Sequence, residues 1–450
     1  MKQTIEKIKA LNAVKVKFAI TDIDGVLRGK YINTNKLLKG LEEGFGFCNV
    51  VFGWDSSDVC YENTQVSGWN TGYPDAMASI DLTTFRQIPW EHNIPFFLAD
   101  FSKDNSDIQK VCPRTLLKSI RQECLDLGFK PLFANEFEWF NFYETSNSFA
   151  QKQFQDPTPI TSGMFGYSLL RIAQNVPYFN DLFDLLLQFN IPLEGLHTET
   201  GNGVYEAAIE YSDILEAADR SVLFKTTVKE IAYKHNIMAS FMAKWNAQLP
   251  GCSGHIHQSL WNETQSKNLF YDDACKNNIS SIMESYIAGQ LYCLPYILPL
   301  YAPTINSYKR FVSGSWASIS QSWGIENRTT ALRVIPHSSK SMRLETRVSG
   351  ADCNAYLAMS AALASGLYGI KKGLKLQTLP TLGNEYSSKV NSRLPKTLFE
   401  AIQNMKASDI PNLLFGEVFT DHFIKTREWE HEQFMTSVTN WELKRYFEII

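Results

Sequence analysis

The chain has 450 residues, of which 44% are hydrophobic and 20% charged, and its formal net charge is −4. These values are typical of a globular protein with two or three domains, and the near-neutral charge provides no basic surface for nucleic acid. The most apolar stretch, residues 291–302, is too short to cross a bilayer. The N-terminus lacks the apolar segment of a secretory signal, and the eight cysteines include no CxxC pair, so we expect reduced thiols and a cytoplasmic protein.

The first predicted elements are a short amphipathic helix and a hairpin. The helix covers residues 2–12. Residues 14–22 then alternate between apolar and charged side chains, which is the period of a half-buried strand, and residues 26–32 return as its partner after the turn at Asp24-Gly25. Residues 33–105 predict further short strands, with turn signals at Gly68, Gly72-Tyr73-Pro74 and Pro95. We therefore expect a small β-rich domain over residues 1–108.

The remainder, residues 109–450, predicts one α+β catalytic domain in which short strands alternate with helices. A helix should begin at Pro113 and end at Gly128, because proline is common at the first helical position and glycine just after the last. The other strong helical patterns cover residues 203–219, 221–236, 278–294 and 351–373.

Acidic and histidine residues recur at strand spacing in this second part. Glu136 and Glu138 share one face of a predicted strand, while Phe137 and Trp139 point to the other. The aromatic neighbours argue for burial, and buried carboxylates need a cation or hydrogen-bond donors.

Three more segments add similar groups. They are Gly254-His255-Ile256-His257, the alternation Arg343-Leu344-Glu345-Thr346-Arg347, and a glycine-containing loop from His197 to Glu206 that also holds Glu199. Each alone has a structural explanation, such as a solvated face or a ladder of ion pairs. Together, five glutamates and one histidine form an oxygen-rich ligand set that suits Mg²⁺ or Mn²⁺ better than structural zinc.

A cluster of arginines follows the histidine segment. Arg310, Arg328 and Arg333 lie within one short stretch, and their planar guanidinium groups suit phosphate and carboxylate recognition. Carboxylates that hold divalent cations, combined with arginines, are what phosphoryl transfer requires.

In this order and spacing, the segments resemble the glutamine synthetase family over nearly the whole chain. The similarity is carried by the N-terminal hairpin, the loop ETGNGVYE, and the segments NEFEWF, FMAKWN, GCSGHIHQSL, NSYKR, NRTTALR and RLETR. The closing residues 438–447 also resemble the C-terminal helix of the family.

The resemblance implies a role for each matching residue. The ligands of the metal on the substrate side would be Glu138, Glu199 and Glu206. The ligands of the metal that bridges the nucleotide phosphates would be Glu136, His255 and Glu345. Glutamate and the transferred phosphoryl group would contact Arg310, Arg328, Arg347 and the backbone at Gly251. ATP would contact Arg333, Arg343, His257 and Ser259.

The resemblance also implies the fold, the assembly and the reaction. The expected fold is a β-grasp-like N-terminal domain joined to a catalytic domain with a curved antiparallel sheet. Active sites would lie between subunits of a ring-forming homo-oligomer, such as a dodecamer. The γ-carboxylate of glutamate would attack ATP to give a γ-glutamyl phosphate, and an amine would then displace phosphate.

The sequence departs from the ammonia-using members where the nucleophile binds. The family's Gly-Tyr-Glu-Ala-Pro flap reads Gly314-Ser-Trp316-Ala-Ser, and its Gly-Tyr-Phe segment reads Gly163-Met164-Phe165. The aspartate that binds ammonium from the next subunit has an offset counterpart in Asp55, which follows Trp54. Larger apolar groups suit an alkyl or aryl amine, whose carbon surface they bury, so the sequence favours the γ-glutamyl-amine branch of the family.

Alternatives from other classes stay open at this stage. They are glutamine synthetase proper with ammonia as substrate, and a catalytically silent scaffold. The segment from Phe18 to Leu27 also copies a phosphatase motif in which Asp22 would be the nucleophile. A dinucleotide site at Gly201-Asn-Gly203 is disfavoured because the third glycine is absent.

Overall fold

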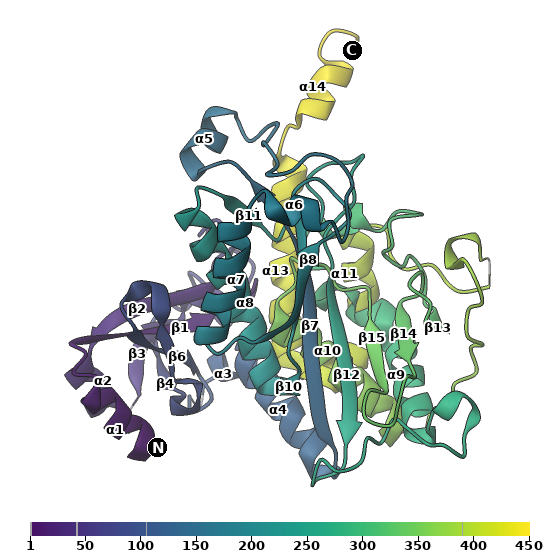
Figure 1. The fold of residues 1–450 in the computed structure, drawn as a ribbon, viewed down its shortest axis with the longest axis horizontal. Helices are drawn as coiled ribbons and strands as arrows, with labels where there is room; N and C mark the ends of the chain where they lie inside the picture. Colours follow the sequence, from purple (N-terminus) through teal and green to yellow (C-terminus); the bar gives the residue numbers. More distant parts are fainter. Residues whose placement is uncertain (1, 42–43, 105, 389) are drawn as a thin grey trace.

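The computed structural model describes residues 2–41, 44–104, 106–388 and 390–450, and Figure 1 shows their arrangement around two sheets. The first sheet is six-stranded, in the order β2-β1-β6-β4-β3, with β5 on β6. Its elements are α1 (Lys2–Ala10), β1 (Lys15–Thr21), β2 (Leu27–Asn33), α2 (Thr34–Gly40), β3 (Phe45–Cys48), β4 (Asp75–Ile80), β5 (Arg86–Ile88) and β6 (Ile94–Asp100), with 3₁₀ turns η1 (Asn49–Phe52), η2 (Leu82–Thr84) and η3 (Pro89–Glu91).

The predicted first helix and hairpin are confirmed, and β1 pairs with β2 from Lys15 opposite Asn33 to Thr21 opposite Leu27. The predicted turn at Pro95 is wrong, because Pro95 lies buried within β6. The side chain of Asn33 accepts a hydrogen bond from the backbone of Asn35 and starts α2, a helix that the prediction of strands missed.

The hairpin excludes the phosphatase reading of Asp22. That reading needs a helix after the first strand, whereas this chain continues directly into β2. Asp22 is buried, and its two carboxylate oxygens accept hydrogen bonds from the backbone of Asp24 and Val26 and from Arg28.

The second sheet is nine-stranded, in the order β13-β14-β15-β12-β7-β9-β8, with β10 and β11 also on β7. All its pairs are antiparallel except β13 with β14. Its strands are β7 (Lys130–Phe142), β8 (Leu193–Thr198), β9 (Val204–Ile209), β10 (Ser212–Asp213), β11 (Met238–Ser240), β12 (Gly254–Trp261), β13 (Trp323–Ile325), β14 (Leu332–Ile335) and β15 (Arg343–Thr346).

Helices α4 and α8 pack against β7 of this sheet, and α10 packs against α4, α8 and α9 (Figure 1). The helices are α3 (Ile108–Val111), α4 (Pro113–Asp126), α5 (Ser146–Gln151), α6 (Leu169–Ala173), α7 (Val176–Gln188), α8 (Ile214–Lys234), α9 (Ser281–Ile297), α10 (Ala355–Lys371), α11 (Leu398–Lys406), α12 (Ile410–Phe415), α13 (Glu417–Thr436) and α14 (Asn440–Tyr446). Short 3₁₀ turns are η4 (Lys276–Asn278), η5 (Leu298–Leu300), η6 (Ser307–Arg310) and η7 (Glu385–Ser387). No helix in these described ranges is long and apolar enough to span a bilayer.

The helix predicted over residues 203–219 is wrong in its first half. Residues up to Asp213 form β9 and β10, and α8 begins only at Ile214. Good helix formers such as Glu206 and Ala207 are recruited by pairing with β7, so tertiary contacts override their local propensity. Asp213 caps α8 by accepting a hydrogen bond from the backbone of Leu215.

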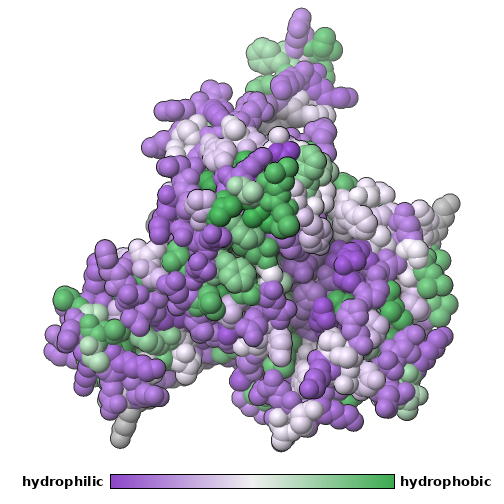
Figure 2. Space-filling view, viewed as in Figure 1, coloured by the Kyte–Doolittle hydropathy of each residue, from purple (hydrophilic) through white to green (hydrophobic). Residues whose placement is uncertain are grey.

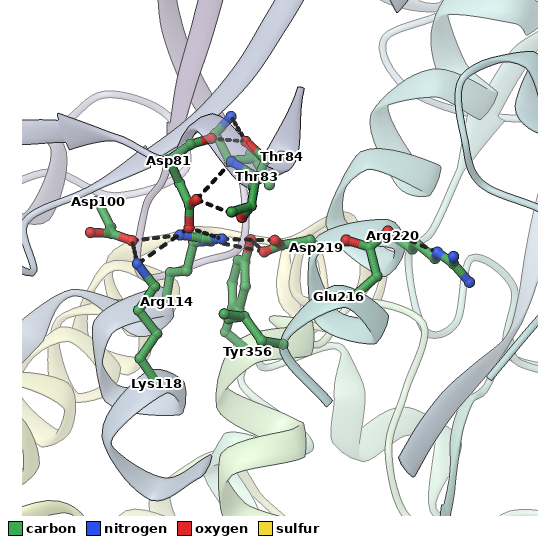
Figure 3. A network of polar contacts seen from close by, with 12 residues as sticks. Asp81, Thr83, Thr84, Asp100, Arg114, Lys118, Glu216, Asp219, Arg220 and Tyr356 are labelled. Atoms are coloured by element: carbon green, nitrogen blue, oxygen red, sulfur yellow. Dashed lines mark hydrogen bonds and ion pairs between the residues drawn. The ribbon is translucent and has the colours of Figure 1, made fainter. Parts of the chain in front are cut away.

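One buried ion network joins the two sheets through α4 and α8 (Figure 3). Arg114 on α4 lies 2.6 Å from Asp100 of β6, 3.0 Å from Asp81 and 2.8 Å from Asp219 of α8. Tyr356 of α10 donates a further hydrogen bond to Asp219. The predicted domain boundary at residue 108 stays a prediction, because β6 contributes side chains to both hydrophobic cores.

Candidate active site

The register of the second sheet brings the predicted ligands onto neighbouring strands. Glu138 of β7 stands opposite Glu206 of β9, which in turn stands opposite His197 of β8. Ligand atoms of His197, Glu199 and Glu206 all lie within 4.8 Å of one another. The geometry therefore assembles a first acidic group, defined here as His197, Glu199, Glu206 and the adjacent Glu138.

The first group carries excess negative charge in a buried place. Burial, together with the charges of Glu206 and Glu199, raises the pKa of Glu138 to about 8. Although burial opposes it, the hydrogen bond to Glu206 raises the pKa of His197 to about 9. Carboxylates whose charges are this poorly compensated fit a site for a divalent cation.

A second acidic group forms where β7, β12 and β15 run side by side. His255 stands opposite Glu136, and His257 stands opposite Glu345. Ligand atoms of Glu136, His257 and Glu345 lie within 4.8 Å of one another. The Nδ1 atom of His255 is 3.2 Å from Glu136 and 3.3 Å from Glu345.

The donor set of this second group also fits a divalent cation. The Nε2 atom of His255 is buried and has no hydrogen-bond partner in the described part of the chain. Despite burial, the charges of Arg347 and His255 lower the pKa of Glu345 to about 2, so this carboxylate is ionised and ready to bind a cation.

The predicted arginines surround these two groups. Arg333 is 3.1 Å from Glu345, and Arg347 pairs with the same carboxylate. Arg310 is buried and donates a hydrogen bond of 2.6 Å to the carbonyl of Val348. Its Nε has no hydrogen-bond partner among the described residues. The side chain of Arg328 is exposed, while its carbonyl accepts a hydrogen bond of 3.1 Å from Arg347.

A cavity of about 270 Å³ opens beside the second group, between β7, β12 and residues 340–343. Three residues predicted to contact ATP, namely His257, Ser259 and Arg343, line it together with Glu136. Arg343 is held against His257 by a hydrogen bond of 3.2 Å. Gly251 lies close to both Ala243 and Arg310. A Cβ at this position would lie 2.4 Å from the carbonyl oxygen of Ala243 and 2.9 Å from the side chain of Arg310, so only glycine fits.

The residues predicted for the nucleophile lie at the surface. Met164 is 51% exposed and Trp316 is 60% exposed, and the carbonyl of Trp316 is 3.5 Å from Arg347. Asp55 sits instead in a turn of the N-terminal part, where it accepts a hydrogen bond of 3.0 Å from Trp429 of α13. In the described part of the chain, Asp55 has no hydrogen bond or ion pair with either acidic group.

Sequence reasoning missed His197 of the first group and Tyr167, which lies beside this group. The sequence predicted only that His197 begins a loop. Its position two residues before Glu199 is the spacing of side chains on one face of a strand. Tyr167 stacks on His197 with 4.4 Å between ring centres. Burial and the charges of Glu206 and Glu199 raise the pKa of Tyr167, which places its phenol near these carboxylates.

Two groups of acidic and histidine residues lie beside a cavity that Arg343 lines, with further arginines around them. This combination is what phosphoryl transfer by an ATP-dependent ligase requires. The family model described as "Glutamine synthetase, catalytic domain" matches residues 110–446. The chain therefore belongs to the glutamine synthetase family, whose members are ATP-dependent ligases that act on glutamate with ammonia or amines.

Individual relatives are similar along almost their whole length. Type-1 glutamine synthetase 2 of Dictyostelium discoideum is 49% identical over 99% of this chain and 86% of its own. Glutamate–isopropylamine ligase of a Pseudomonas species is 34% identical over 98% and 97% of the two chains. Gamma-glutamylethanolamide synthetase of Streptomyces coelicolor is 32% identical over 99% and 96%.

The fold is shared with solved structures. A structure titled as a GmaS/ADP complex superposes with a TM-score of 0.86 over 100% of both chains, at 24% identity. This similarity confirms the predicted α+β fold with its curved catalytic sheet.

Proposed function

We propose that this protein joins glutamate to an organic amine as a γ-glutamyl amide, using ATP. The observation that carries this proposal is an exposed apolar patch beside the first acidic group. It consists of Met164, Phe165, Tyr167, Leu169 and Leu170, each 49–81% exposed. Figure 2 shows hydrophobic side chains gathered over α6, next to a hydrophilic hollow.

The patch supports an amine with carbon substituents. Tyr167 connects it to the carboxylates through its stack on His197. Apolar side chains gain about 25 cal/mol for each Å² of carbon surface that they bury, a gain that ammonia cannot provide. The aromatic rings of Tyr167 and Trp316 offer faces that attract an alkylammonium ion.

The two acidic groups would hold divalent cations, Mg²⁺ or Mn²⁺. The predicted ligands on the substrate side are Glu138, Glu199 and Glu206, and those on the nucleotide side are Glu136, His255 and Glu345. Bound there, such cations neutralise charge on the phosphates of ATP. His197 and His257, whose ring nitrogens reach the same groups, would orient these carboxylates or join them as ligands.

The remaining residues would position glutamate, ATP and the amine. Arg310 and Arg347 would hold glutamate, so that its γ-carboxylate attacks ATP to give a γ-glutamyl phosphate. Arg328 would then stabilise the transferred phosphoryl group. The amine must lose a proton before it displaces phosphate, and we propose that the carboxylate of Asp55 from a neighbouring copy accepts this proton.

The assembly proposed with this function is a ring-forming homo-oligomer with active sites between subunits. Helix α14 supports it, because α14 projects from the body of the chain (Figure 1), and Trp441 in the helix and Phe447 and Ile450 after it are exposed. The eight cysteines are all free thiols, which supports a reducing compartment such as the cytoplasm.

The test measures phosphate release with ATP and glutamate across ammonium, methylamine, isopropylamine, ethanolamine, putrescine and spermidine. We expect kcat/KM for at least one organic amine to exceed that for ammonium roughly tenfold or more. Activity with ammonium alone would support the second candidate, glutamine synthetase proper, which the 49% identical relative favours. No phosphate release with any amine would support a silent scaffold instead.

A further inference from the structure

A separate cavity of about 210 Å³ lies between the first sheet and helix α8. Its walls come from β1, β2, β5 and β6 on one side, and from α8 and Phe189 on the other. A single buried water needs only roughly 10–15 Å³, and protein interiors are otherwise packed without voids of this size. No residue proposed above for catalysis lines this cavity, so it is a second concave site on the chain.

One end of the cavity is aromatic. Trp90 and Phe189 meet edge to face with 5.2 Å between ring centres, and Phe96 lies 5.8 Å from Phe189. Ile88 and Leu223 complete the apolar lining. This end is suited to the carbon skeleton of a small organic molecule.

The other end is charged, because Lys17 and Glu230 line it. Lys17 is 2.7 Å from Glu91 and 3.8 Å from Glu230, and Trp90 donates a hydrogen bond of 2.7 Å to Glu230. Lys17 therefore forms its close ion pair with Glu91 and keeps only a longer contact with Glu230. Burial raises the pKa of Glu230, although the charge of Lys17 and the hydrogen bond from Trp90 oppose this shift.

We propose that this cavity binds a small organic cation, with its ammonium group at Glu230 and its apolar body against Trp90, Phe96 and Phe189. The carboxylate of Glu230 attracts a cation rather than an anion, because Lys17 forms its hydrogen bond with Glu91 and stays 3.8 Å from Glu230. This site is independent of the proposed ligase reaction.

A ligand in this cavity contacts both the first sheet and α8. It therefore stabilises their packing and raises the melting temperature of the chain. Helix α8 also reaches the catalytic sheet, because Ser221 donates a hydrogen bond of 2.8 Å to Asn135, the neighbour of Glu136 on β7.

The test is calorimetric titration of the full-length protein, without ATP or glutamate, with 2-phenylethylammonium. The matched anion phenylacetate and the neutral 2-phenylethanol serve as comparison probes. We expect the cation to bind at least tenfold more tightly than either. Glu230→Gln removes the charge and Thr226→Leu fills the cavity, so each should weaken the cation at least tenfold. The control Lys234→Gln, at an exposed position on the same helix outside the cavity, should bind as the wild type does.

A further variant separates this site from the proposed amine site. In Glu199→Gln the catalytic carboxylate is neutral while the cavity is intact, so binding of the cation should persist there. Loss of binding in Glu199→Gln with retention in Glu230→Gln would overturn the proposal. So would equal binding of phenylacetate, or no binding of the cation to the wild type at millimolar concentration.

Discussion

At the scale of single residues, the site depends on carboxylates that are held close together against their own repulsion. Glu138 is the strongest case, because it is half-buried, lies opposite Glu206 and receives one backbone hydrogen bond of 2.7 Å from Ser253. Its raised pKa reports this shortage of positive charge.

Glu138→Ala tests this interpretation. We expect a loss of turnover of at least roughly 100-fold, because even residues that only support metal ligands commonly cost 10–100-fold. Added Mg²⁺ or Mn²⁺ should also raise the melting temperature of the wild type much more than that of the variant. The control Glu210→Ala removes an exposed carboxylate just after β9 and should change neither quantity. Retained turnover in Glu138→Ala would break the metal assignment.

Trp316 tests the proposed amine preference. If its indole contacts the substituent of the amine, Trp316→Ala should lower kcat/KM for the preferred amine by roughly 10-fold or more and change that for ammonium little. Trp69→Ala, at a tryptophan that is 70% exposed but outside the site, is the control. An equal loss with both substrates would assign Trp316 to packing of the loop.

At the scale of helices and strands, buried polar contacts connect elements that lie far apart in the sequence. The Arg114 network joins α4 to β6 and α8, and His422 of α13 lies completely buried. The contribution of the Arg114 network and of His422 to the free energy of unfolding can each be measured with one substitution.

Arg114→Met should lower the free energy of unfolding by about 3–5 kcal/mol, because Asp100 and Asp219 would remain buried with less compensation. Urea denaturation measures this change. The matched control is Arg121→Met on the same helix, where the pair with Asp213 is partly exposed and is worth about 0–1 kcal/mol. Similar losses in both variants would show that the network adds little.

His422 should make the chain less stable as the pH falls. Burial lowers its pKa to about 4, so between pH 6.5 and 4 the unfolded chain binds a proton that the folded chain does not. Stability is therefore present above pH 6.5 and declines below it, by at most roughly 3 kcal/mol. In His422→Phe the difference in unfolding free energy between pH 7.5 and 5 should shrink, whereas the exposed control His337→Gln should keep it.

At the scale of the whole molecule, the chain leaves apolar surface uncovered at its C-terminal end. Helix α14 stands away from both sheets in Figure 1. It exposes the side chains of Trp441, Leu443 and Tyr446. Surface of this kind is typical of contacts between subunits.

Truncation after Ser437 should therefore reduce the size of the assembly, as measured by light scattering during size-exclusion chromatography. The double variant Trp441→Ser and Phe447→Ser should act in the same direction while it keeps the chain length. An unchanged mass of the assembly in both variants would show that α14 does not contribute to contacts between subunits.

The sequence alone determined the family, and it predicted a two-part chain and a set of metal ligands that stay predictions. Strand periodicity predicted that Glu136 and Glu138 share a face, and the same logic held for His255 and His257, because side chains alternate with a period of two wherever a strand forms. Local helix punctuation likewise predicted α4.

Only the tertiary structure decided which of these groups meet. Residues 203–213 became strands because β7 offered hydrogen-bond partners, and that pairing placed Glu206 beside Glu138 and His197. Tyr167 joined them through a stack that no spacing predicts. Periodicity specifies which face of an element a residue occupies, but the contact between two faces depends on register and packing, which are set by the chain as a whole.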